Sequence, residues 1–245
     1  MSAAPELEGQ VAVVTGASSD IGKAIALALV ERGAKLALIG RRADALRYEP
    51  RAHSICCDLT QSADVGRMVA EVNATFGGRI DILVNVAGGT MGLDAPLWKV
   101  SEFDFGQVLA LNLTAAFLTM KAVLPTMIAC RHGRIINIGG TYGLRGRANR
   151  TAYSAAKWGL RGLTKSAALE AGPFNITVNC VSPGVVEGPR LTEIGTEAAA
   201  RLAESLALRR VTTPDDVARM VCFIAGEGGR QVTGQDLVVD GGWTI

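Results

Sequence analysis

A tyrosine and a lysine stand one helical turn apart in a segment of small and apolar residues. These residues recur at helical spacing, and no proline interrupts them before Pro173, so the spacing predicts one long helix over 151–171. Tyr153 and Lys157 are then i and i+4 on one face. A nearby ammonium favours phenolate and lowers the pKa of a tyrosine, which can then exchange a proton with an alcohol oxygen. An ordinary solvent-facing pair has the same spacing, so the rest of the chain must decide.

The composition indicates a soluble globular protein. The chain has 245 residues, of which 49% are hydrophobic and 20% charged, and its formal net charge is +2. So small a charge favours neither nucleic acid nor an anionic membrane as a partner. Five scattered cysteines and only two histidines indicate buried free thiols in a reducing compartment and no metal site. The N-terminus lacks a signal-peptide pattern and the apolar stretch 108–128 is interrupted by polar residues and Pro125, so we expect a cytoplasmic location and no membrane span.

Apolar strands alternate with helices along the chain. The expected strands are 10–15, 35–39, 54–57, 80–85, 133–138, 176–181 and 237–239. The expected helices are 21–32, 62–76 with Ser62 as its cap, 101–130 with a bend near Pro125, 151–171, and 213–225 with its cap at Thr213. Since parallel strands need crossover connections, this order predicts one α/β domain over residues 1–245. We expect a doubly wound parallel sheet of about seven strands, a Rossmann fold, with helices on both faces. Residues 1–8 are expected to be a loose tail, and 187–208 a substrate lid.

Ligands of such sheets bind beyond the carboxyl ends of the strands. There the first strand runs into the glycine-rich turn Thr15-Gly16-Ala-Ser-Ser-Asp20-Ile-Gly22, which opens a helix. Glycine lets backbone approach a ligand closely, and a helix N-terminus presents N–H groups to phosphate, so we expect a dinucleotide here. The second strand ends at Gly40, where NAD sites usually carry a carboxylate, and Arg41 and Arg42 follow. Two guanidiniums suit a 2′-phosphate, which favours NADP over NAD; a solvated arginine pair is the other interpretation.

Together these motifs resemble the short-chain dehydrogenase/reductase family, of the classical type, from about Gly9 to Trp243. The matching positions are Thr15-Gly16…Gly22, Asp58, Asn85-Val-Ala-Gly88, Asn112, Tyr153-x-x-x-Lys157 and Pro183-Gly184. The resemblance implies an NAD(P)-dependent oxidoreductase that interconverts a secondary alcohol and a ketone. It also implies a homotetramer built from the helices 101–130 and 151–171 and the C-terminal strand, with a small-molecule substrate.

The resemblance further implies a role for each matching position. Tyr153 would be the acid/base, and Lys157 would bind the nicotinamide ribose and lower the Tyr153 pKa. Asn112 would kink its helix and hold a water that links Lys157 to solvent protons; otherwise it is a satisfied polar residue of a helix. The implied cofactor-binding residues, besides Tyr153 and Lys157, are Gly16, Ser18, Asp20, Ile21, Gly22, Arg41, Arg42, Asp58, Leu59, Asn85, Ala87, Gly88, Pro183, Gly184 and Val186. Asp58 is alternatively only a turn residue that ends a strand.

Three positions depart from the family pattern. Asp20 replaces the middle glycine of the first turn; it can cap the first helix, but it adds negative charge near phosphate. Val86 replaces the second asparagine of the family motif, and we expect little effect. Gly140 stands where the family has its catalytic serine, thirteen positions before Tyr153. Losing a transition-state hydrogen bond of this kind typically costs about 2–4 kcal/mol.

Three explanations of Gly140 remain open. The hydroxyl of Thr141 can take the serine's place, which makes Thr141 a candidate catalytic residue, or the substrate or a water can supply the hydrogen bond. Alternatively the protein binds nucleotide with weak or no catalysis and acts as a regulatory or structural subunit. Gly188 likewise stands where the family often has a cofactor-binding threonine. Arginines 145, 147 and 150 point to an acidic substrate, or else are solvated or at a subunit contact.

Overall fold

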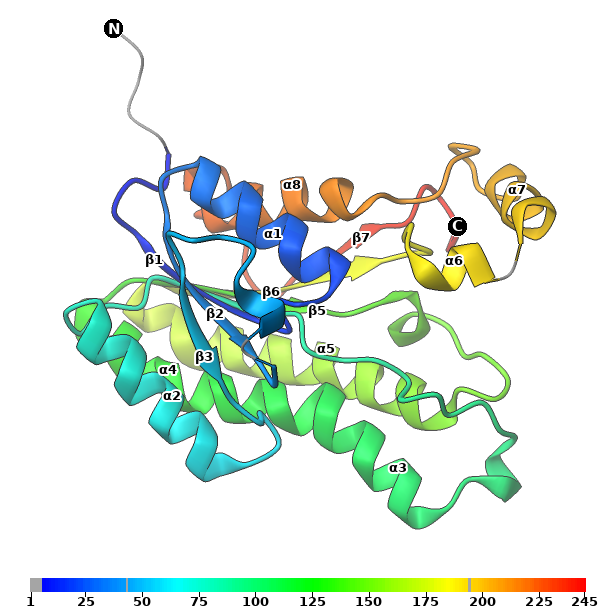
Figure 1. The fold of residues 1–245 in the computed structure, drawn as a ribbon, viewed down its shortest axis with the longest axis horizontal. Coiled ribbons are helices and arrows are strands. Elements are labelled where there is room, and N and C mark those ends of the chain that lie inside the picture. Colours follow the sequence, from blue (N-terminus) through cyan, green and yellow to red (C-terminus); the bar gives the residue numbers. More distant parts are fainter. Residues whose placement is uncertain (1–5, 43, 194) are drawn as a thin grey trace, which may run out of the picture.

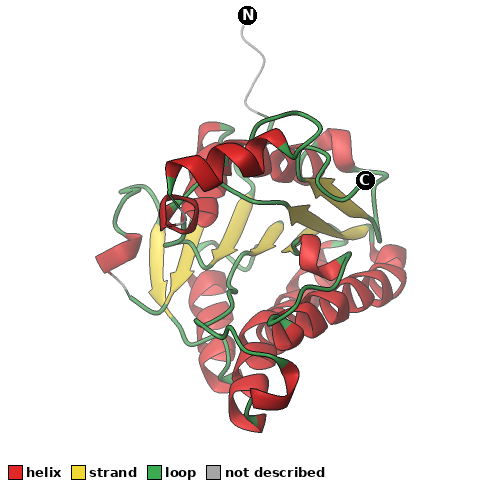
Figure 2. Ribbon diagram, turned by 90° about the vertical axis from the view of Figure 1, so that its right-hand side faces the viewer, coloured by secondary structure: helices red, strands yellow, loops and turns green. Residues whose placement is uncertain are grey.

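The computed structural model describes residues 6–42, 44–193 and 195–245. Within them, seven parallel strands form one sheet in the order β3-β2-β1-β4-β5-β6-β7. The strands are β1 (Val11–Thr15), β2 (Lys35–Gly40), β3 (His53–Cys56), β4 (Ile82–Asn85), β5 (Gly133–Ile138), β6 (Ile176–Pro183) and β7 (Asp236–Val239). Figure 2 shows them in a row between two layers of helices, which confirms the doubly wound sheet.

The helices divide between the two faces of the sheet (Figure 1). One face is covered by α1 (Asp20–Glu31) and α8 (Pro214–Ala225), and the other by α2 (Ser62–Thr75), α4 (Ala115–Cys130) and α5 (Thr151–Ala171). A π-helical turn (Ala110–Thr114) joins α3 (Glu102–Leu109) to α4, while α6 (Pro189–Glu193) and α7 (Thr196–Glu204) follow β6. Single 3₁₀ turns lie at Asp44–Leu46, Leu97–Lys99, Thr141–Gly143, Gly172–Phe174 and Glu227–Gly229.

The sheet is apolar on both sides because both sides are covered. In β1, Val11 and Val13 join the core beneath α2, α4 and α5, whereas Ala12 and Val14 join the core beneath α1 and α8. Successive strand side chains point to opposite faces, so a strand buried on both sides reads as an unbroken apolar run. This explains why the strands could be found from the sequence.

Several local expectations need correction. Ser62 is the first residue of α2 rather than its cap, and the cap position, Gln61, makes no side-chain capping bond. The continuous helix α4 passes through Pro125, and the irregularity lies instead at the π turn before it. Leu7 is fully buried, so the tail is anchored from there on. Cys56 and Cys130 are exposed free thiols, whereas the other three cysteines are buried as expected. The cap at Thr213 is confirmed, with reciprocal bonds to Asp216.

The long helix Glu102–Cys130 is apolar enough, with a mean hydropathy of 1.6 over its most apolar window, to span a membrane by length and composition. Its side chains at Val108, Met120, Val123 and Met127 are nevertheless buried within the fold. A core helix of a globular domain has the same character, because it too must present an apolar face to its neighbours.

Candidate active site

The first turn is packed so closely, against the end of β4 and against itself, that two of its positions have room only for glycine. Gly16 has a φ of +61°, and a Cβ on it would meet the nitrogen of Ala87 at 2.6 Å. A Cβ on Gly22 would meet the carbonyl oxygen of Gly16 at 2.4 Å. The N–H of Val86 donates to Thr15 Oγ1 at 3.1 Å, which ties the two loops together. The bare backbone at the N-terminus of α1 is therefore a cradle that fits a dinucleotide pyrophosphate.

Asp20 does not cap α1. The hydroxyl of Ser19 accepts the N–H of Gly22 at 3.1 Å and occupies the capping position, so Asp20 is the first residue inside the helix. Its carboxylate faces the loop after β6, where Oδ2 lies 3.1 Å from the place of a Cβ on Gly188. A negative charge thus lies at the edge of the cradle, next to the glycine that replaces the family's threonine. Of the other predicted cradle residues, Ser18 is half-buried and Ile21 packs partly into the core.

The predicted adenosine end lies where β2 and β3 finish side by side. Gly40 pairs with Cys56 in the parallel register, and the side chains of Arg41 and Arg42 are exposed beyond it. After β3, Asp58 accepts hydrogen bonds from the N–H and the hydroxyl of Thr60, at 3.0 and 2.8 Å. Asp58 therefore has the turn role that the sequence left open, while its neighbour Leu59 is buried in the core.

Tyr48 joins this end to the first turn, a contact that the sequence did not suggest. Its hydroxyl donates to the carbonyl of Ala17 at 3.0 Å. Burial, together with the negative charge of Glu49, raises the pKa of Tyr48 to about 12, so the hydroxyl keeps its proton and stays a donor. The loop that carries the two arginines is thereby held against the cradle. No periodicity marks such a contact between two loops.

Tyr153 and Lys157 lie on α5 and face the ends of β4 and β5. Lys157 is 3% exposed, and its Nζ donates to the carbonyl of Ile138 at 2.8 Å and lies 5.5 Å from the ring centroid of Tyr153. Nζ also lies 3.4 Å from the place of a Cβ on Gly88. Tyr153 is only half-buried and can reach a substrate. The predicted pair therefore shares one face and borders the loop after β4.

Asn112 reaches the same loop from the opposite helix. Its amide group accepts from the N–H of Gly89 at 2.9 Å and donates to the carbonyl of Gly89 at 2.8 Å. The second amide hydrogen is donated to Val108 within the distorted helix, also at 2.8 Å. The π turn around Asn112 is the irregularity that the family resemblance implied. Since both amide hydrogens bind protein, a water can meet the side chain only as a donor to its oxygen, and the water link to Lys157 stays a prediction.

The remaining predicted cofactor-binding residues lie at the carboxyl ends of β4 and β6. Asn85 is buried and donates to Asn137 at 2.9 Å while accepting from Thr119 at 2.8 Å, which joins β4, β5 and α4. Pro183 ends β6, and a Cβ on Gly184 would lie 2.7 Å from that of Asp240. Val186 then pairs with Thr212 in a short bridge. The loop after β6, which is predicted to line the nicotinamide, is thus held from behind by the chain next to β7.

The turn facing Tyr153 has an unusual backbone. Gly140 has φ 151° and ψ 154°, a region that is essentially restricted to glycine. A Cβ there would lie 3.7 Å from the hydroxyl of Tyr153, so the position does face the predicted acid/base. Thr141 follows and is 3% exposed, at the start of the 3₁₀ turn. The structure thus places Gly140 opposite Tyr153 with Thr141 next to it in the chain, in a shape that does not suit a serine at 140.

Aromatic rings and arginines border Tyr153 on its open side. Tyr142 meets Tyr153 edge to face at 6.0 Å, and Trp243 from the C-terminal segment lies 6.2 Å from Tyr142. Arg145 stacks on Trp243 at 4.1 Å, and Arg147 donates to the hydroxyl of Tyr142. Neither ring was expected from the sequence, because these contacts depend on the C-terminus folding back over the turn. The remaining arginine of this loop, at 150, forms an ion pair with Asp94 at 2.7 Å.

Comparisons with known proteins agree with this geometry. Residues 16–244 match the family model described as enoyl-(acyl carrier protein) reductase. The chain is 37% identical over 241 residues to the 3-oxoacyl-[acyl-carrier-protein] reductase of Vibrio cholerae, covering 96% of this chain and 98% of that one. It is 36% identical over 252 residues to D-threitol dehydrogenase of Mycolicibacterium smegmatis, covering 98% and 94%. The crystal structure of NAD⁺-bound xylitol dehydrogenase superposes with a TM-score of 0.90 at 33% identity, covering 97% of this chain and all of that one. From the first turn to the C-terminal segment, the chain belongs to the short-chain dehydrogenase/reductase family of oxidoreductases.

Proposed function

We propose that this protein is an oxidoreductase that interconverts a secondary alcohol and a ketone by hydride transfer and prefers NADP. The observation that carries the proposal is the arrangement around Gly88, where Lys157 and Asn112 meet from two helices, with Tyr153 one turn from Lys157. A structural Tyr/Lys pair on a helix surface would not need a buried ammonium aimed at the loop after β4. The bare cradle in front of it fits a dinucleotide.

The chemistry divides between a bound coenzyme and the chain. A bound nicotinamide supplies or accepts the hydride at its ring, being oxidised when a ketone is reduced. Tyr153 gives its proton to the ketone oxygen in that direction and takes the hydroxyl proton back in the other. Lys157, fixed by the carbonyl of Ile138, keeps its ammonium beside the ring of Tyr153 and would hold the ribose of a bound coenzyme. Asn112 fixes the loop that both residues border.

The hydroxyl next to the missing serine is that of Thr141. Because Thr141 follows Gly140, whose position faces Tyr153, and starts the same turn, we infer that it supplies the hydrogen bond to the substrate oxygen. This keeps the transition-state interaction that would otherwise be lost, although from the neighbouring position in the chain.

The preference for NADP is proposed from the end of β2. Gly40 offers no carboxylate to a ribose diol, and the exposed Arg41 and Arg42 can hold a 2′-phosphate by forked hydrogen bonds. Arg41→Ala should therefore weaken NADP binding by about tenfold or more and leave NAD binding nearly unchanged. Arg47→Ala, also on this loop, is the control. An equal loss for both coenzymes would remove the basis for the preference.

The central test is Tyr153→Phe, assayed by nicotinamide absorbance over a panel of alcohols and ketones. We expect turnover to be abolished and coenzyme affinity to be unchanged, since the phenylalanine keeps the ring and loses only the proton. Tyr142→Phe is the matched control and should keep most activity. Substantial turnover by Tyr153→Phe would refute the assigned role. A wild-type protein that binds coenzyme tightly and turns over no member of the panel would instead support a nucleotide-binding subunit.

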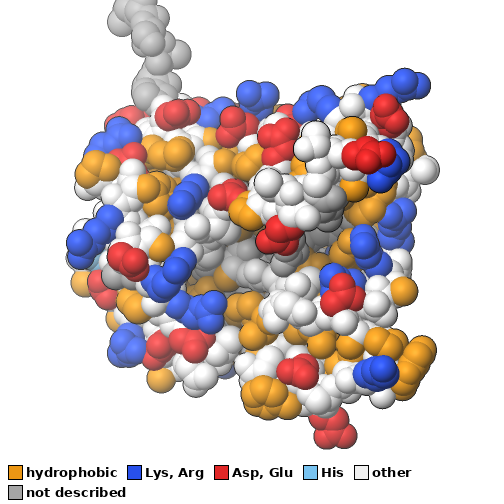
Figure 3. Space-filling view, turned by 45° about the vertical axis from the view of Figure 1, so that its right-hand side comes forward, with side chains coloured by type: hydrophobic (Ala, Val, Ile, Leu, Met, Phe, Trp, Pro, Cys, Tyr) orange, Lys and Arg blue, Asp and Glu red, His pale blue; other side chains and the backbone are white. Residues whose placement is uncertain are grey.

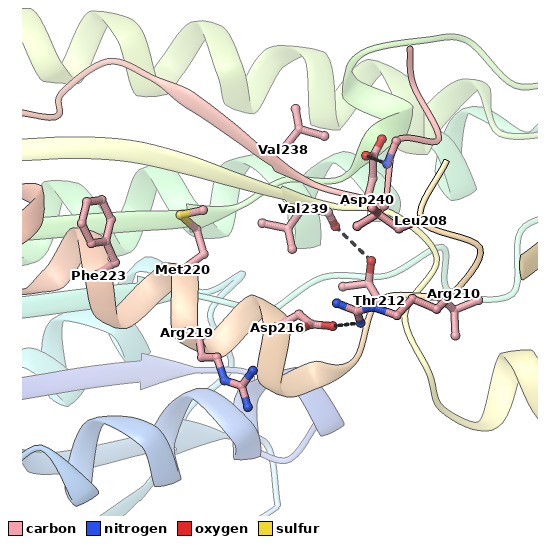
Figure 4. A pocket seen from close by; sticks show the side chains of 13 residues that line it. Leu208, Arg210, Thr212, Asp216, Arg219, Met220, Phe223, Val238, Val239 and Asp240 are labelled. Atoms are coloured by element: carbon pink, nitrogen blue, oxygen red, sulfur yellow. Dashed lines mark hydrogen bonds and ion pairs between the residues drawn. The ribbon is translucent and has the colours of Figure 1, made fainter. Parts of the chain in front are cut away.

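We also propose a cytoplasmic homotetramer. Two separate faces carry exposed large apolar side chains, one on the layer of α3, α4 and α5, which includes Phe103, Phe117 and Trp158. Figure 3 shows hydrophobic side chains gathered over the lower part of the molecule, where Figure 1 places α3. The other face is the edge of the sheet at β7 and α8, where Phe223 and Val238 border a hollow of about 550 Å³ (Figure 4). Two self-complementary faces generate a tetramer, which light scattering can measure.

A further inference from the structure

We propose that Ser182, Asp236 and Arg161 are positioning residues that hold the turn 139–143 in a backbone shape which only glycine adopts at position 140. On this view the catalytic serine is absent because a hydrogen-bonded clamp excludes it. The clamp itself is independent of the reaction; its catalytic consequence rests on the proposed function.

Ser182 is the centre of the clamp. It lies on β6, is fully buried, and donates its proton to Asp236 Oδ1 on β7 at 2.6 Å. A carboxylate paired with Arg161 can only accept, so the serine proton is committed to it. The oxygen of Ser182 is then left to accept, and it receives the N–H of Gly140 at 3.3 Å. A charged pair thereby orients a hydroxyl that holds the backbone of the catalytic turn.

Arg161 grips the same turn at its other end. It lies on α5, two turns after Tyr153, and its Nε is 2.5 Å from Asp236 Oδ2, an ion pair without the alignment of a hydrogen bond. Its Nη1 also donates to the carbonyl of Gly143 at 2.7 Å. The turn is therefore fixed at residue 140 from β6 and at residue 143 from α5, and Thr141 lies between these two points.

The clamp dictates glycine at two adjacent positions for different reasons. A Cβ on Gly139 would lie 2.6 Å from both Cys180 Sγ and Ser182 Oγ, so the approach of Ser182 leaves it no room. At Gly140 the space is open, since among the described residues beyond its chain neighbours a Cβ would meet Tyr153 alone within 4 Å, but the φ and ψ angles suit glycine alone. A serine at 140 must change those angles, and the change would pull the N–H of residue 140 away from Ser182.

The consequence for catalysis is the placement of Thr141. With both ends of the turn held, the main chain of Thr141 is fixed relative to Tyr153, which stands on the same helix as Arg161. A catalytic hydroxyl that is misplaced by about 1 Å can lose on the order of a hundredfold in rate. Loosening the clamp should therefore lower kcat without changing coenzyme affinity.

The first arm of the experiment measures thermal stability and needs no substrate. Gly140→Ala should lower Tm by about 5 °C in the wild-type background, because the added Cβ is strained. After Ser182→Ala the same substitution should lower Tm by less than half as much, because the turn can then relax. Gly146→Ala in the neighbouring exposed loop, where nothing lies within 4 Å, is the control and should show no such coupling. Equal Tm losses from Gly140→Ala in the two backgrounds would overturn the clamp.

The second arm measures kcat and coenzyme affinity. Ser182→Ala should lower kcat on the order of tenfold with an unchanged coenzyme Kd. Gly140→Ser should lower kcat in the wild type, but raise it when added to Ser182→Ala, because the relaxed turn can present the new hydroxyl to the substrate. A merely structural role for Ser182 would not reverse the sign of this effect. If Gly140→Ser lowers kcat equally in both backgrounds, the catalytic role of the clamp is wrong.

Asp236→Ala is a second variant that disrupts the clamp, for use if Ser182→Ala folds poorly. It removes the acceptor that orients Ser182, so it should also reduce the Tm loss caused by Gly140→Ala, though to a smaller extent. Glu227→Ala, which breaks the exposed ion pair with Arg230, is the matched control. A full Tm loss in the Asp236→Ala background would count against the clamp. Since the stability arm uses no coenzyme, it stands even if the wild-type protein proves to have no turnover.

Discussion

Glycines gather at two places along the carboxyl edge of the sheet, and the two groups are there for opposite reasons. In the first turn, Gly16 and Gly22 lie against other backbone, and any side chain would collide at 2.6 Å or less. At the proposed catalytic edge, a Cβ on Gly140 would lie 3.7 Å from the Tyr153 hydroxyl, and a Cβ on Gly188 would lie 3.1 Å from the end of the exposed Asp20 side chain, which can move aside. Their φ angles of +151° and +152°, rather than crowding, favour glycine.

The comparison separates two kinds of constraint that look alike in a sequence. Space at the first turn is set by the pairing of β1 with β4 and by the backbone contacts of the turn itself. Backbone shape at the catalytic edge is set by side chains from other strands and helices, such as Ser182 behind Gly140. We therefore expect substitutions in the first region to disrupt the fold and the coenzyme site together. Those in the second region should act mainly on local conformation.

The largest effect should come from Gly22→Ala. Its Cβ would lie 2.4 Å from a backbone oxygen, so the turn must shift, which we expect to cost about 3 kcal/mol in unfolding free energy. Coenzyme affinity, measured by fluorescence titration, should fall on the order of a hundredfold, since the cradle would be deformed. Gly66→Ala in α2, where nothing lies within 4 Å, is the control and should stabilise by about 0.5–1 kcal/mol. A Gly22→Ala protein of normal stability would contradict the view that crowding requires glycine in the first turn.

The carboxylate of Asp216, at the start of α8, anchors the segment behind the loop after β6, and its contribution to stability should depend on pH. The side-chain hydrogen bond from Arg210, followed by the backbone N–H of Thr213, lowers the pKa of Asp216 from 3.8 to about 2. Thr212, which precedes this cap, pairs with Val186, and Figure 4 shows Thr212 bonded to Val239 and Asp216 to Arg210. A depressed carboxyl pKa stabilises the fold above the unfolded pKa and loses that effect as pH falls toward the folded pKa.

Asp216→Ala should therefore lower the unfolding free energy at pH 7 by about 1–2 kcal/mol, allowing for solvent screening of the half-exposed arginine. The difference from wild type should shrink between about pH 4 and pH 2. Urea unfolding at a series of pH values measures it. Asp215→Ala, in the same first turn of α8, is the control. A difference that stays constant down to pH 2 would contradict an ionised anchor.

Gly188→Ala tests whether backbone conformation or crowding by neighbouring atoms requires glycine at position 188. We expect a cost of about 1 kcal/mol, because a φ of +152° strains alanine. Most of this cost should remain when Asp20→Gly removes the one oxygen near the new Cβ. Thermal unfolding of the four proteins in this cycle gives the coupling. Complete rescue by Asp20→Gly would mean that crowding, as in the first turn, is the constraint at position 188.

The smallest expected effect is electrostatic. Asp20 puts an exposed carboxylate beside the predicted pyrophosphate site, so Asp20→Asn should tighten coenzyme binding by about threefold at low salt, and by less at high salt. Glu31→Gln, at the opposite end of α1, is the matched control and should change nothing. Weaker binding by Asp20→Asn would show that the carboxylate helps to hold the coenzyme.

Local sequence patterns predict most of the helices and strands. The helix expected over 151–171 has those bounds in the structure, because its small residues, the following Gly172-Pro173 and its spacing are all local features. The strands were found because burial on both faces leaves no polar interruption, although β4 begins two residues later and β6 ends two residues later than expected. Caps were less predictable: Ser19 rather than Asp20 caps α1, and two adjacent capping residue types cannot be ranked without the backbone geometry.

The sequence by itself determined the fold class, the cradle glycines and the shared face of Tyr153 and Lys157, because each follows from periodicity or from the spacing of neighbours in the chain. Only the tertiary structure decided the shape of the turn 139–143, which we propose to be catalytic. Ser182, Asp236 and Arg161 come from three separate elements, and no spacing along the chain foretells that they meet at the backbone of residues 140–143. Such contacts form when distant segments are buried together, and directional hydrogen bonds then fix a geometry to which local propensity is blind.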